Sequence, residues 1–373
     1  VLLYMQIKPT RLYPQENIRT DLDRFMEVFM YVKRYYVEPV ESDKLITGAI
    51  EGLLGKLDPH SVYLPPVDLK EANEDLAGNF DGIGVEFNIF SDTVNVVYVF
   101  PGGPSEKAGL QIGDKILKVN DSTLTRKDYT VASIKTLIRG PKGSTASLLV
   151  LRGKNTLPVK VTRGKIPVPS IDAAYMIDQT TGYIKLSKFS ETSYEEFMQN
   201  MENLQKQGLK NLVFDLRGNG GGFMNEAVDI ADEFLDGDKL IVYTEGVNSK
   251  KREYHCKRPG LFETGKLVLL VNETSASASE VLAGALQDWC RATIIGRRTF
   301  GKGLVQEQYQ LRDGSAIRLT IARYYTPLGR SIQRSYEKGK KVYMDDLWER
   351  FNNGELVSED SMKNHNGKNF TTN

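Results

Sequence analysis

The sequence predicts a mixed α/β protein built from several domains. Apolar residues recur at helical spacing over residues 18–57, and short β-type runs separated by glycines follow from Phe80. Between residues 183 and 311 strands and helices alternate, a pattern typical of a layered α/β core. At 373 residues the chain is long enough for two or three domains, each with its own core.

The composition is that of an ordinary globular protein and argues against several classes of partner. Hydrophobic residues make up 40% of the chain, and 49 Lys and Arg residues balance 48 Asp and Glu residues. No global positive field would therefore attract nucleic acid or an anionic membrane. No stretch reaches the roughly 18 consecutive apolar residues of a membrane helix, and the apolar residues 1–5 are too few for an anchor. Two cysteines, Cys256 and Cys290, cannot form a disulfide framework, although one bridge between them stays open.

The N-terminal region is expected to be helical up to a proline. Leu22 and Phe25 recur on one face of a first helix, and a second apolar run covers residues 45–57. Pro59 then resists continuation of the helix. His60, beside this proline, is expected to be a loop histidine without a catalytic role. None of the three histidines is near Ser277 or Lys302 in the sequence, which weakens a Ser-His-Asp interpretation without excluding it, since triads assemble in space.

The sequence pattern of residues 80–163, short β-type runs separated by glycines, is typical of a small β domain. A strand is expected over residues 94–99, followed by the sequence PGGPS at 101–105 and by Ala-Gly-Leu and Gly-Asp before residue 115. A helix is expected at 131–138, with closing strands at 147–151 and 159–163. This order of motifs resembles the PDZ domains of secreted proteases.

The PDZ resemblance implies a peptide-binding loop just before the first strands. In such domains an exposed sheet edge pairs with an extended chain, and a glycine-lined loop offers N–H groups to a terminal carboxylate. The candidate loop consists of Gly82, Ile83, Gly84 and Val85. Taken alone, these residues favour an ordinary glycine turn before a strand; together with the downstream motifs they favour peptide binding.

A linker with two prolines, at 165–170, is expected to lead into the larger α/β region. Strands are expected there at 183–186, 212–217 and 315–325, and amphipathic helices at 193–207 and 224–235. The strand at 212–217 runs into the glycine-rich sequence GNGGG. This run lacks the Gly-Lys-Ser/Thr ending of a phosphate loop and the Gly-x-Gly-x-x-Gly order of a dinucleotide fold, so nucleotide binding is not expected.

The most informative stretch covers residues 266–306. An apolar run at 266–271 predicts a buried strand, and the sequence SASASE at 275–280 then opens a helix rich in Ala and Leu. Unpaired N–H groups at a helix N-terminus favour negative charge, which suits a nucleophilic serine whose attack on a carbonyl creates an oxyanion. Taken alone, Ser277 and Glu280 form only a capping-box pattern. A lone Gly-Lys-Gly, as at Lys302, is likewise more often a turn than a site.

Together, these motifs resemble the carboxyl-terminal-processing (tail-specific) serine proteases. In that family a Ser-Ala-Ser-Ala-Ser-Glu helix start is followed by Phe-Gly-Lys-Gly-x-Val-Gln, and residues 275–280 and 300–306 match both segments. The resemblance implies that Ser277 is the nucleophile, that Lys302 is the general base and that Gln306 orients the lysine.

The same resemblance implies the oxyanion donors. Gly221 and Gly222 match a family segment that packs beside the serine and lends a backbone N–H to the oxyanion. The second donor would be the N–H of Ala278, directly after the nucleophile. The residues leave open which of the two glycines faces the oxyanion.

The family also implies an architecture. The core is expected to be the crotonase/ClpP-like spiral ββα protease core, with an inserted PDZ domain and an N-terminal helical segment. The expected parts are an N-terminal helical region (1–78), the PDZ domain (79–164), the Ser-Lys protease core (165–334) and a C-terminal appendage (335–373). The appendage is polar and mixed in charge, and no chemistry of its own is expected there.

The implied mechanism requires a neutral lysine. A free lysine has a pKa of about 10.4, so burial in an apolar pocket has to lower the pKa of Lys302. Phe300 and Leu304 are expected to supply the apolar wall. Gly301 and Gly303 are expected to let the lysine strand approach the serine helix closely.

Two polar residues near these motifs have different expected roles. Gln306 can accept an N–H from the lysine without adding a negative charge. A carboxylate in its place would raise the lysine pKa. Asp288 follows Ser277 by eleven residues, roughly 16 Å along a continuous helix, and is therefore too remote to share the serine's proton. It is expected to be structural, bridging to a neighbouring loop.

The sequence therefore predicts a serine endopeptidase that recognises apolar protein C-terminal tails through its PDZ domain and cleaves by a Ser-Lys acyl-enzyme mechanism. No metal or organic cofactor is expected. Protein or peptide substrates are the expected partners, with a homodimer and a regulatory adaptor as further candidates. The resemblance implies an extracytoplasmic location, in the bacterial periplasm or at a membrane. Two alternatives stay open: a catalytically silent PDZ peptide-binding scaffold, and a crotonase-like acyl-transfer enzyme acting on small substrates.

Overall fold

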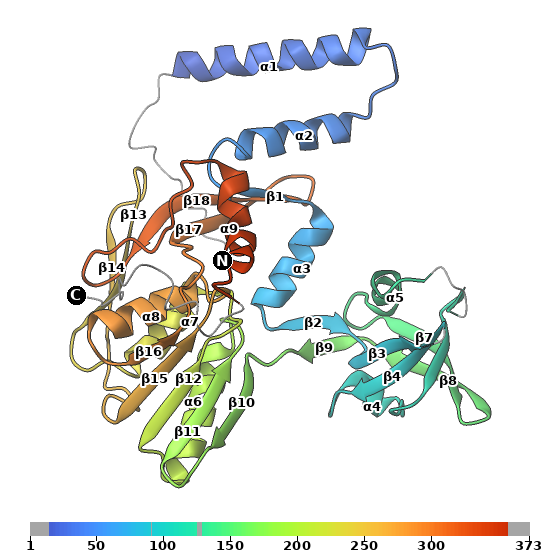
Figure 1. Cartoon of the computed structure of the whole chain (residues 1–373). Coiled ribbons are helices and arrows are strands. Elements are labelled where there is room, and N and C mark those ends of the chain that lie inside the picture. Colours follow the sequence, from blue (N-terminus) through green and yellow to red (C-terminus); the bar gives the residue numbers. More distant parts are fainter. Residues whose placement is uncertain (1–14, 91, 125–128, 357–373) are drawn as a thin grey trace, which may run out of the picture.

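The computed structural model describes residues 15–90, 92–124 and 129–356. These residues form a two-sheet α/β core, a small β domain beside it and a pair of N-terminal helices (Figure 1). The mixed α/β class expected from the sequence is confirmed. The apolar residues 1–5 and the end of the predicted C-terminal appendage lie outside the described residues.

The main sheet of the core is a parallel array with one antiparallel edge. Its elements in chain order are β10 (Ile171–Met176), β11 (Thr181–Leu186), α6 (Ser193–Lys206), β12 (Asn211–Asp215), α7 (Met224–Asp232), β15 (Lys266–Val271), α8 (Ala278–Asp288) and β16 (Thr293–Gly296). The strand order is β10-β11-β12-β15-β16, and only β10 pairs antiparallel. Since parallel strands need crossover connections, a helix follows each of β11, β12 and β15.

A second, antiparallel sheet covers the helices. Its strands are β1 (Val62–Leu64), β13 (Leu240–Glu245), β14 (Arg252–His255), β17 (Leu304–Gln310) and β18 (Ala316–Tyr325). The order is β1-β18-β13-β14, and β17 also pairs with β18. Helices α7 and α8 pack against each other and contact β13, which places them between the two sheets (Figure 1). The apolar centre of this core includes Phe197, Phe214 and Phe234, whose ring centroids lie 5.5–5.8 Å apart.

The small β domain has its own apolar core. Its elements are β3 (Val85–Phe90), β4 (Thr93–Val99), α4 (Pro104–Lys107), β5 (Lys115–Val119), β6 (Ser122–Thr123), α5 (Val131–Ile138), β7 (Thr145–Arg152) and β8 (Asn155–Thr162). The sheet order is β3-β4-β5-β7-β8, so β3 is an edge strand. Helix α5 spans the predicted residues, and its Ile134 is fully buried in the core of the domain.

A two-stranded ribbon joins this domain to the core. Strand β2 (Asn79–Gly82) pairs antiparallel with β9 (Gly164–Pro167). The prediction of a plain linker at 165–170 is therefore wrong for its first half. The backbone pairing with residues 79–82, which no local pattern reveals, makes this stretch a strand.

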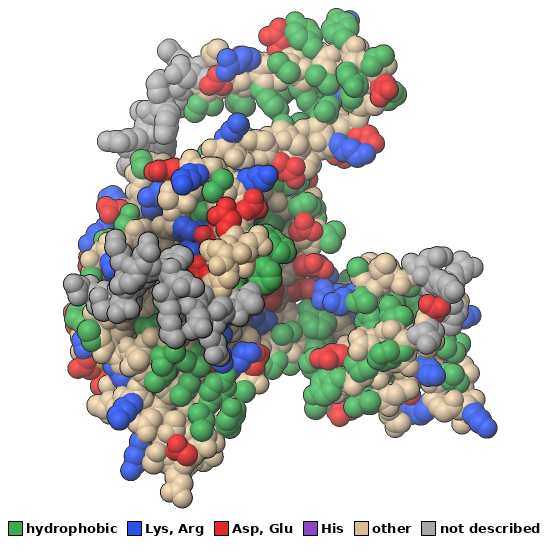
Figure 2. All heavy atoms as spheres, in the orientation of Figure 1, with side chains coloured by type: hydrophobic (Ala, Val, Ile, Leu, Met, Phe, Trp, Pro, Cys, Tyr) green, Lys and Arg blue, Asp and Glu red, His purple; other side chains and the backbone are tan. Residues whose placement is uncertain are grey.

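The N-terminal helices project from the core (Figure 1). They are α1 (Gln15–Tyr35) and α2 (Ser42–Leu54), and α3 (Pro66–Leu76) follows on the way to the small β domain. The helical prediction is confirmed, but the apolar side chains of α1 are exposed, and they gather on its surface in Figure 2. They include Leu22, Phe25, Met26, Met30 and Tyr31. None of the helices in the described part of the chain is both long and apolar enough to cross a membrane.

One further helix follows the strands of the core. Helix α9 (Lys340–Asn352) lies on the core, and its Tyr343 and Arg350 are buried. Cys256 and Cys290 are both free thiols, so the bridge that the sequence left open is not formed.

Candidate active site

Ser277 lies at the sharp turn between β15 and α8. Its backbone has φ 56° and ψ −113°, a conformation that residues other than glycine rarely adopt. The side chain is 8% exposed. Its N–H donates to the Glu280 carboxylate at 2.9 Å, so the pairing expected of a capping box is present. The helix cap therefore coexists with a strained backbone, a combination that often marks a functional residue.

The glycine-rich loop after β12 packs directly against this turn through a buried asparagine. The Asn219 side-chain amide donates to the Leu186 carbonyl at 3.0 Å, and the Asn219 backbone carbonyl accepts the Ala276 N–H at 3.0 Å. Gly221 has φ 101°, and a Cβ there would lie 2.8 Å from the Ser277 Cβ. Only glycine allows this approach, so the loop and the serine turn form one unit.

The two glycines that the sequence could not separate differ in their hydrogen bonding. The Gly221 N–H donates to the Asn219 side chain at 2.8 Å. The N–H groups of Gly222 and Ala278 have no hydrogen-bond partner within the described part of the chain. Gly222 also requires glycine, because a Cβ there would lie 2.1 Å from the Phe189 carbonyl oxygen. This arrangement leaves the N–H groups of Gly222 and Ala278 as donors available to a ligand.

Glu280, on the first turn of α8, connects the serine turn with the lysine loop. Its buried carboxylate accepts the N–H of Ser277 at 2.9 Å and that of Lys302 at 2.8 Å on the same oxygen. The two backbone nitrogens are therefore no more than about 6 Å apart. The other oxygen accepts the Thr299 hydroxyl at 2.7 Å and the Gly301 N–H at 2.6 Å. Burial raises the pKa of Glu280, although these hydrogen bonds oppose the shift.

Lys302 has the electrostatic environment that a general base requires. Burial lowers its pKa, and the positive charge of Arg318 lowers the pKa further. The charges of Asp58 and Glu280 oppose this shift without reversing it. Among the described residues, no hydrogen bond joins the Lys302 Nζ atom to the Ser277 hydroxyl.

The glycines that flank Lys302 face the segment after β18, which the sequence did not predict. A Cβ on Gly301 would lie 2.8 Å from the Arg334 Cβ, and a Cβ on Gly303 would lie 2.5 Å from the Gln333 backbone nitrogen. The Arg334 N–H also donates to the Gly301 carbonyl at 2.9 Å. The glycines therefore let the lysine loop approach the segment after β18, and not the serine helix. The lysine loop does lie close to the serine turn, as expected, through Glu280 and through a hydrogen bond from the Phe300 N–H to the Ser275 carbonyl at 3.0 Å. The part of the expectation that differs is the role of Gly301 and Gly303, which face the segment after β18.

Gln306 and His60 form a second connection to the lysine loop. The Gln306 side-chain amide donates to the His60 carbonyl at 2.7 Å, and it has no hydrogen bond to Lys302 among the described residues. The His60 ring packs edge-on against Phe300, with centroids 6.1 Å apart. Burial and the nearby charge of Lys302 lower the pKa of His60 to about 4. His60 is therefore a loop histidine, as expected, but it lies beside the lysine motif.

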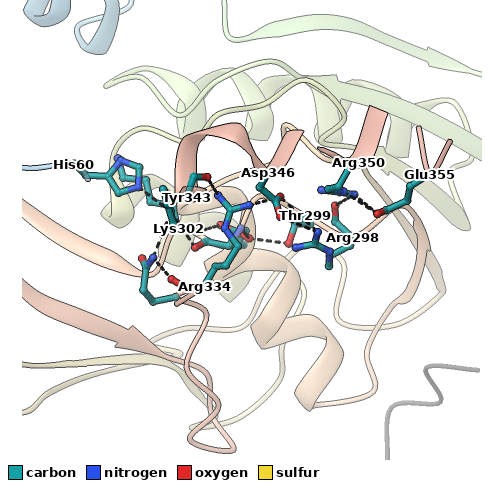
Figure 3. Close-up of polar contacts among 12 residues, drawn as sticks. His60, Arg298, Thr299, Lys302, Arg334, Tyr343, Asp346, Arg350 and Glu355 are labelled. Carbon is teal, nitrogen blue, oxygen red and sulfur yellow. Dashed lines mark hydrogen bonds and ion pairs between the residues drawn. The ribbon is translucent and has the colours of Figure 1, made fainter. Parts of the chain in front are cut away.

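The C-terminal helix α9 reaches the same cluster, which Figure 3 shows around Lys302. The Tyr343 hydroxyl lies 2.9 Å from the His60 Nε2 atom. Arg334 forms an ion pair with Asp346 on α9. The predicted C-terminal appendage therefore packs against the lysine loop, a contact that its polar sequence does not indicate.

Asp288 also has a clear position. Asp288 accepts the Leu328 N–H at 2.9 Å and the Arg330 Nε–H at 2.9 Å, which confirms its expected role as a bridge to a neighbouring loop. The described residues contain no cluster of three or more His, Cys, Asp or Glu side chains arranged to hold a metal ion.

The predicted peptide-binding loop lies at the start of the edge strand β3. Ile83 is 1% exposed and belongs to the core of the small β domain, and its carbonyl accepts the Ser105 N–H at 2.9 Å. Gly84 has φ 77°, a left-handed conformation that favours glycine. Gly82 ends β2 and Val85 begins β3, so the loop turns the chain from the ribbon into the edge strand.

Three family models match the chain. Peptidase family S41 matches residues 180–339, the PDZ domain matches residues 96–152, and the Activating protease CtpB N-terminal domain matches residues 6–66. The protease core with an inserted PDZ domain, expected from the sequence, is thereby confirmed.

Several known proteins are similar over most of the chain. A carboxy-terminal-processing protease of Bartonella bacilliformis is 34% identical over 86% of this chain and 74% of its own length. The carboxy-terminal processing protease CtpB of Bacillus subtilis is 34% identical over 84% of this chain, which spans 66% of that relative. The solved structure of a photosystem II D1 C-terminal processing protease is 33% identical, with 83% of each chain covered and a TM-score of 0.46. The chain therefore belongs to the carboxy-terminal-processing proteases of peptidase family S41.

Proposed function

We propose that this protein is a serine endopeptidase that binds the apolar C-terminal tails of protein substrates in its PDZ domain and cleaves them by a Ser-Lys acyl-enzyme mechanism. One observation carries the proposal. A single oxygen of the buried Glu280 carboxylate holds the backbones of Ser277 and Lys302 together. The strained serine at a helix N-terminus and the desolvated lysine are thereby adjacent.

In this mechanism the neutral Lys302 amine takes the proton of the Ser277 hydroxyl as the serine oxygen attacks the scissile carbonyl. The N–H groups of Gly222 and Ala278 then bind the resulting oxyanion. Lys302 returns the proton to the departing amine, and an acyl-enzyme forms. Water activated by the same lysine hydrolyses the ester. Gln306, whose amide N–H already binds the His60 carbonyl, has its oxygen left to accept an N–H of the lysine.

The PDZ domain supplies recognition of the tail. The edge strand β3 can pair with an extended peptide, and the loop of Gly82, Ile83, Gly84 and Val85 precedes it. An extended tail bound there would gain main-chain hydrogen bonds from β3, while the loop N–H groups bind its terminal carboxylate.

The test is digestion of an unfolded protein with an apolar C-terminal tail between pH 6 and 10. We expect wild type to cleave with a rate that rises with pH, since the neutral lysine is the active form. Ser277→Ala and Lys302→Ala should lose cleavage but retain tail binding, whereas Lys206→Ala, at an exposed position on α6, should behave like wild type. Normal cleavage by Lys302→Ala would refute the mechanism. Tail binding without any cleavage by wild type would instead indicate a PDZ scaffold.

We also propose that the chain self-associates and acts outside the cytoplasm. The exposed apolar side chains of α1 support self-association, because a patch of this kind on a projecting helix is typical of an interface. Light scattering should show a dimer that Phe25→Asp dissociates and Asp23→Asn, on the same exposed helix, does not. A monomeric wild type would contradict self-association. A regulatory adaptor is a further proposal. Cell fractionation tests the extracytoplasmic location, and co-purification tests the adaptor.

A further inference from the structure

We propose that Tyr343, on the C-terminal helix α9, is a positioning residue that holds Lys302 in its desolvated pocket. The inference rests on the proposed Ser-Lys function and adds a role for a helix outside the serine and lysine motifs. Tyr343 is 3% exposed although it lies on a short, mostly polar helix. The contacts of this buried side chain lead to the lysine loop.

The Tyr343 hydroxyl lies where three chain segments meet. It is 2.9 Å from the His60 Nε2 atom, 3.3 Å from the Gln333 amide nitrogen and 3.5 Å from the Gly301 carbonyl oxygen. A phenol can donate one hydrogen bond and accept others, so one hydroxyl serves these neighbours. The oxygen of the Gln333 amide accepts the Gly303 N–H at 2.9 Å. Tyr343 therefore contacts the residue before Lys302 directly and the residue after it through Gln333.

The Tyr343 ring closes the apolar side of the lysine loop. It packs edge-on against Phe300, with centroids 6.0 Å apart, and against His60 at 5.3 Å. The Arg334 guanidinium lies 4.2 Å from the centre of the Tyr343 ring and 5.0 Å from that of Phe300. These packed planar groups cover this side of the lysine loop. Since burial is the main cause of the lowered pKa of Lys302, loss of this ring would admit water towards the lysine and raise its pKa back towards the ordinary value.

Polar contacts of α9 hold Tyr343 in place. Asp346 forms ion pairs with Arg334 and, at 3.3 Å, with Arg298. Arg334 also donates to the Tyr343 carbonyl at 2.8 Å, and the buried Arg350 donates to the Arg298 carbonyl at 2.9 Å. These contacts join two successive turns of α9 to the chain on both sides of the lysine loop (Figure 3).

The charged groups around Lys302 determine how a pH profile is interpreted. Those that act on the lysine are Asp58, Glu280 and Arg318. The charges that act on His60 are those of Lys302, Asp58, Arg334 and Lys340. Its pKa of about 4 leaves it neutral above pH 6. Burial raises the pKa of Tyr343, which stays neutral over the same range. Lys302 is thus the group whose titration a change at Tyr343 would alter between pH 6 and 10.

The experiment measures kcat and KM between pH 6 and 10 for wild type, Tyr343→Ala, Tyr343→Phe and Trp348→Ala. For Tyr343→Ala we expect the midpoint of kcat/KM to move to higher pH and kcat at pH 7 to fall at least about tenfold, with KM within about twofold. Tyr343→Phe keeps the ring and should retain the wild-type midpoint. Trp348, 68% exposed on the same helix, controls for removal of an aromatic side chain and should behave like wild type.

A second variant keeps the inference testable if Tyr343→Ala does not fold. Asp346→Asn loosens α9 without opening a cavity, and we expect a smaller shift of the midpoint in the same direction. An unchanged midpoint in folded Tyr343→Ala or Asp346→Asn, with activity lost only in proportion to stability, overturns the inference and leaves the Ser-Lys mechanism intact. Cleavage by wild type that does not depend on Lys302 overturns the proposed function itself, so the two failures are distinguishable.

Discussion

The backbone N–H of Lys302 donates to the same Glu280 oxygen that accepts the N–H of Ser277. Lys302 follows Ser277 by 25 positions, and this carboxylate holds their two backbones close together. Glu280 belongs to a capping pattern and takes no part in the proposed chemistry. Its structural role nevertheless makes the chemistry sensitive to it.

Replacing Glu280 with Gln should therefore impair both stability and turnover. The amide can accept from one side only, and its NH2 group would face N–H donors, so buried donors lose their partner. We expect a loss of about 2 kcal/mol or more in the free energy of unfolding and at least about tenfold in kcat. Urea denaturation and steady-state kinetics measure the two effects. Glu195→Gln, on the exposed face of α6, is the control; equal behaviour of both variants would contradict the assigned role.

Gly221→Ala should inactivate the enzyme, whereas Gly220→Ala should not. A Cβ at Gly221 would lie 2.7 Å from the Ala276 carbonyl oxygen and 2.8 Å from the Ser277 Cβ, at φ 101°. Gly220 has no atom within 4 Å of the corresponding position. Because displacement of the serine turn misaligns the nucleophile, we expect a loss of at least about 100-fold in kcat/KM for Gly221→Ala. Similar rates for the two variants would show that the loop does not position Ser277.

Arg318→Gln should move the pH profile of kcat/KM to higher pH. The Arg318 charge helps to lower the pKa of Lys302, so its removal raises the lysine pKa and reduces the neutral fraction at pH 7. The rate should recover as the pH is raised. Arg323→Gln, at an exposed position of the same strand β18, serves as the matched control. A shift to lower pH would contradict the charge effect.

His60→Gln should make the protein less sensitive to mild acid. The pKa of His60 falls from 6.5 to about 4 on folding, so between these values the unfolded chain binds a proton that the folded chain does not. Stability therefore rises with pH in this window and is lost as the pH falls from 6.5 towards 4. Urea midpoints at pH 7 and pH 5 should differ less for His60→Gln than for wild type. His255→Gln, on strand β14, is the control, and an unchanged difference in His60→Gln would refute the linkage.

Local patterns made much of the fold predictable. Strand β15 and helix α5 match their predicted residues because a short apolar run and an amphipathic period are local signals. The Ser277 and Lys302 motifs are likewise contiguous, so they could be recognised without a structure. Their environment, which lowers the lysine pKa, agrees with the predicted requirement for a neutral lysine.

The parts that could not be predicted depend on contacts between distant residues. Gln306 binds the carbonyl of a residue 246 positions earlier, and no local pattern encodes such a pair. Helix α9 buries only Tyr343 and Arg350. Its sequence therefore lacks the regular spacing of apolar residues that would predict a packed helix. The pairing of β2 with β9 also joins residues that are more than 80 positions apart, so the local pattern at 165–170 predicts a linker and not a strand.

The ribbon has a consequence for how this protein can be rearranged. Gly82 and Gly164 are register partners, so the two ends of the PDZ domain lie next to each other in the ribbon. An insertion whose ends already touch can be removed and the cut ends rejoined by a short turn, without stretching the protease core. The architecture therefore allows the PDZ domain to be exchanged as a single unit while the protease core stays unaltered.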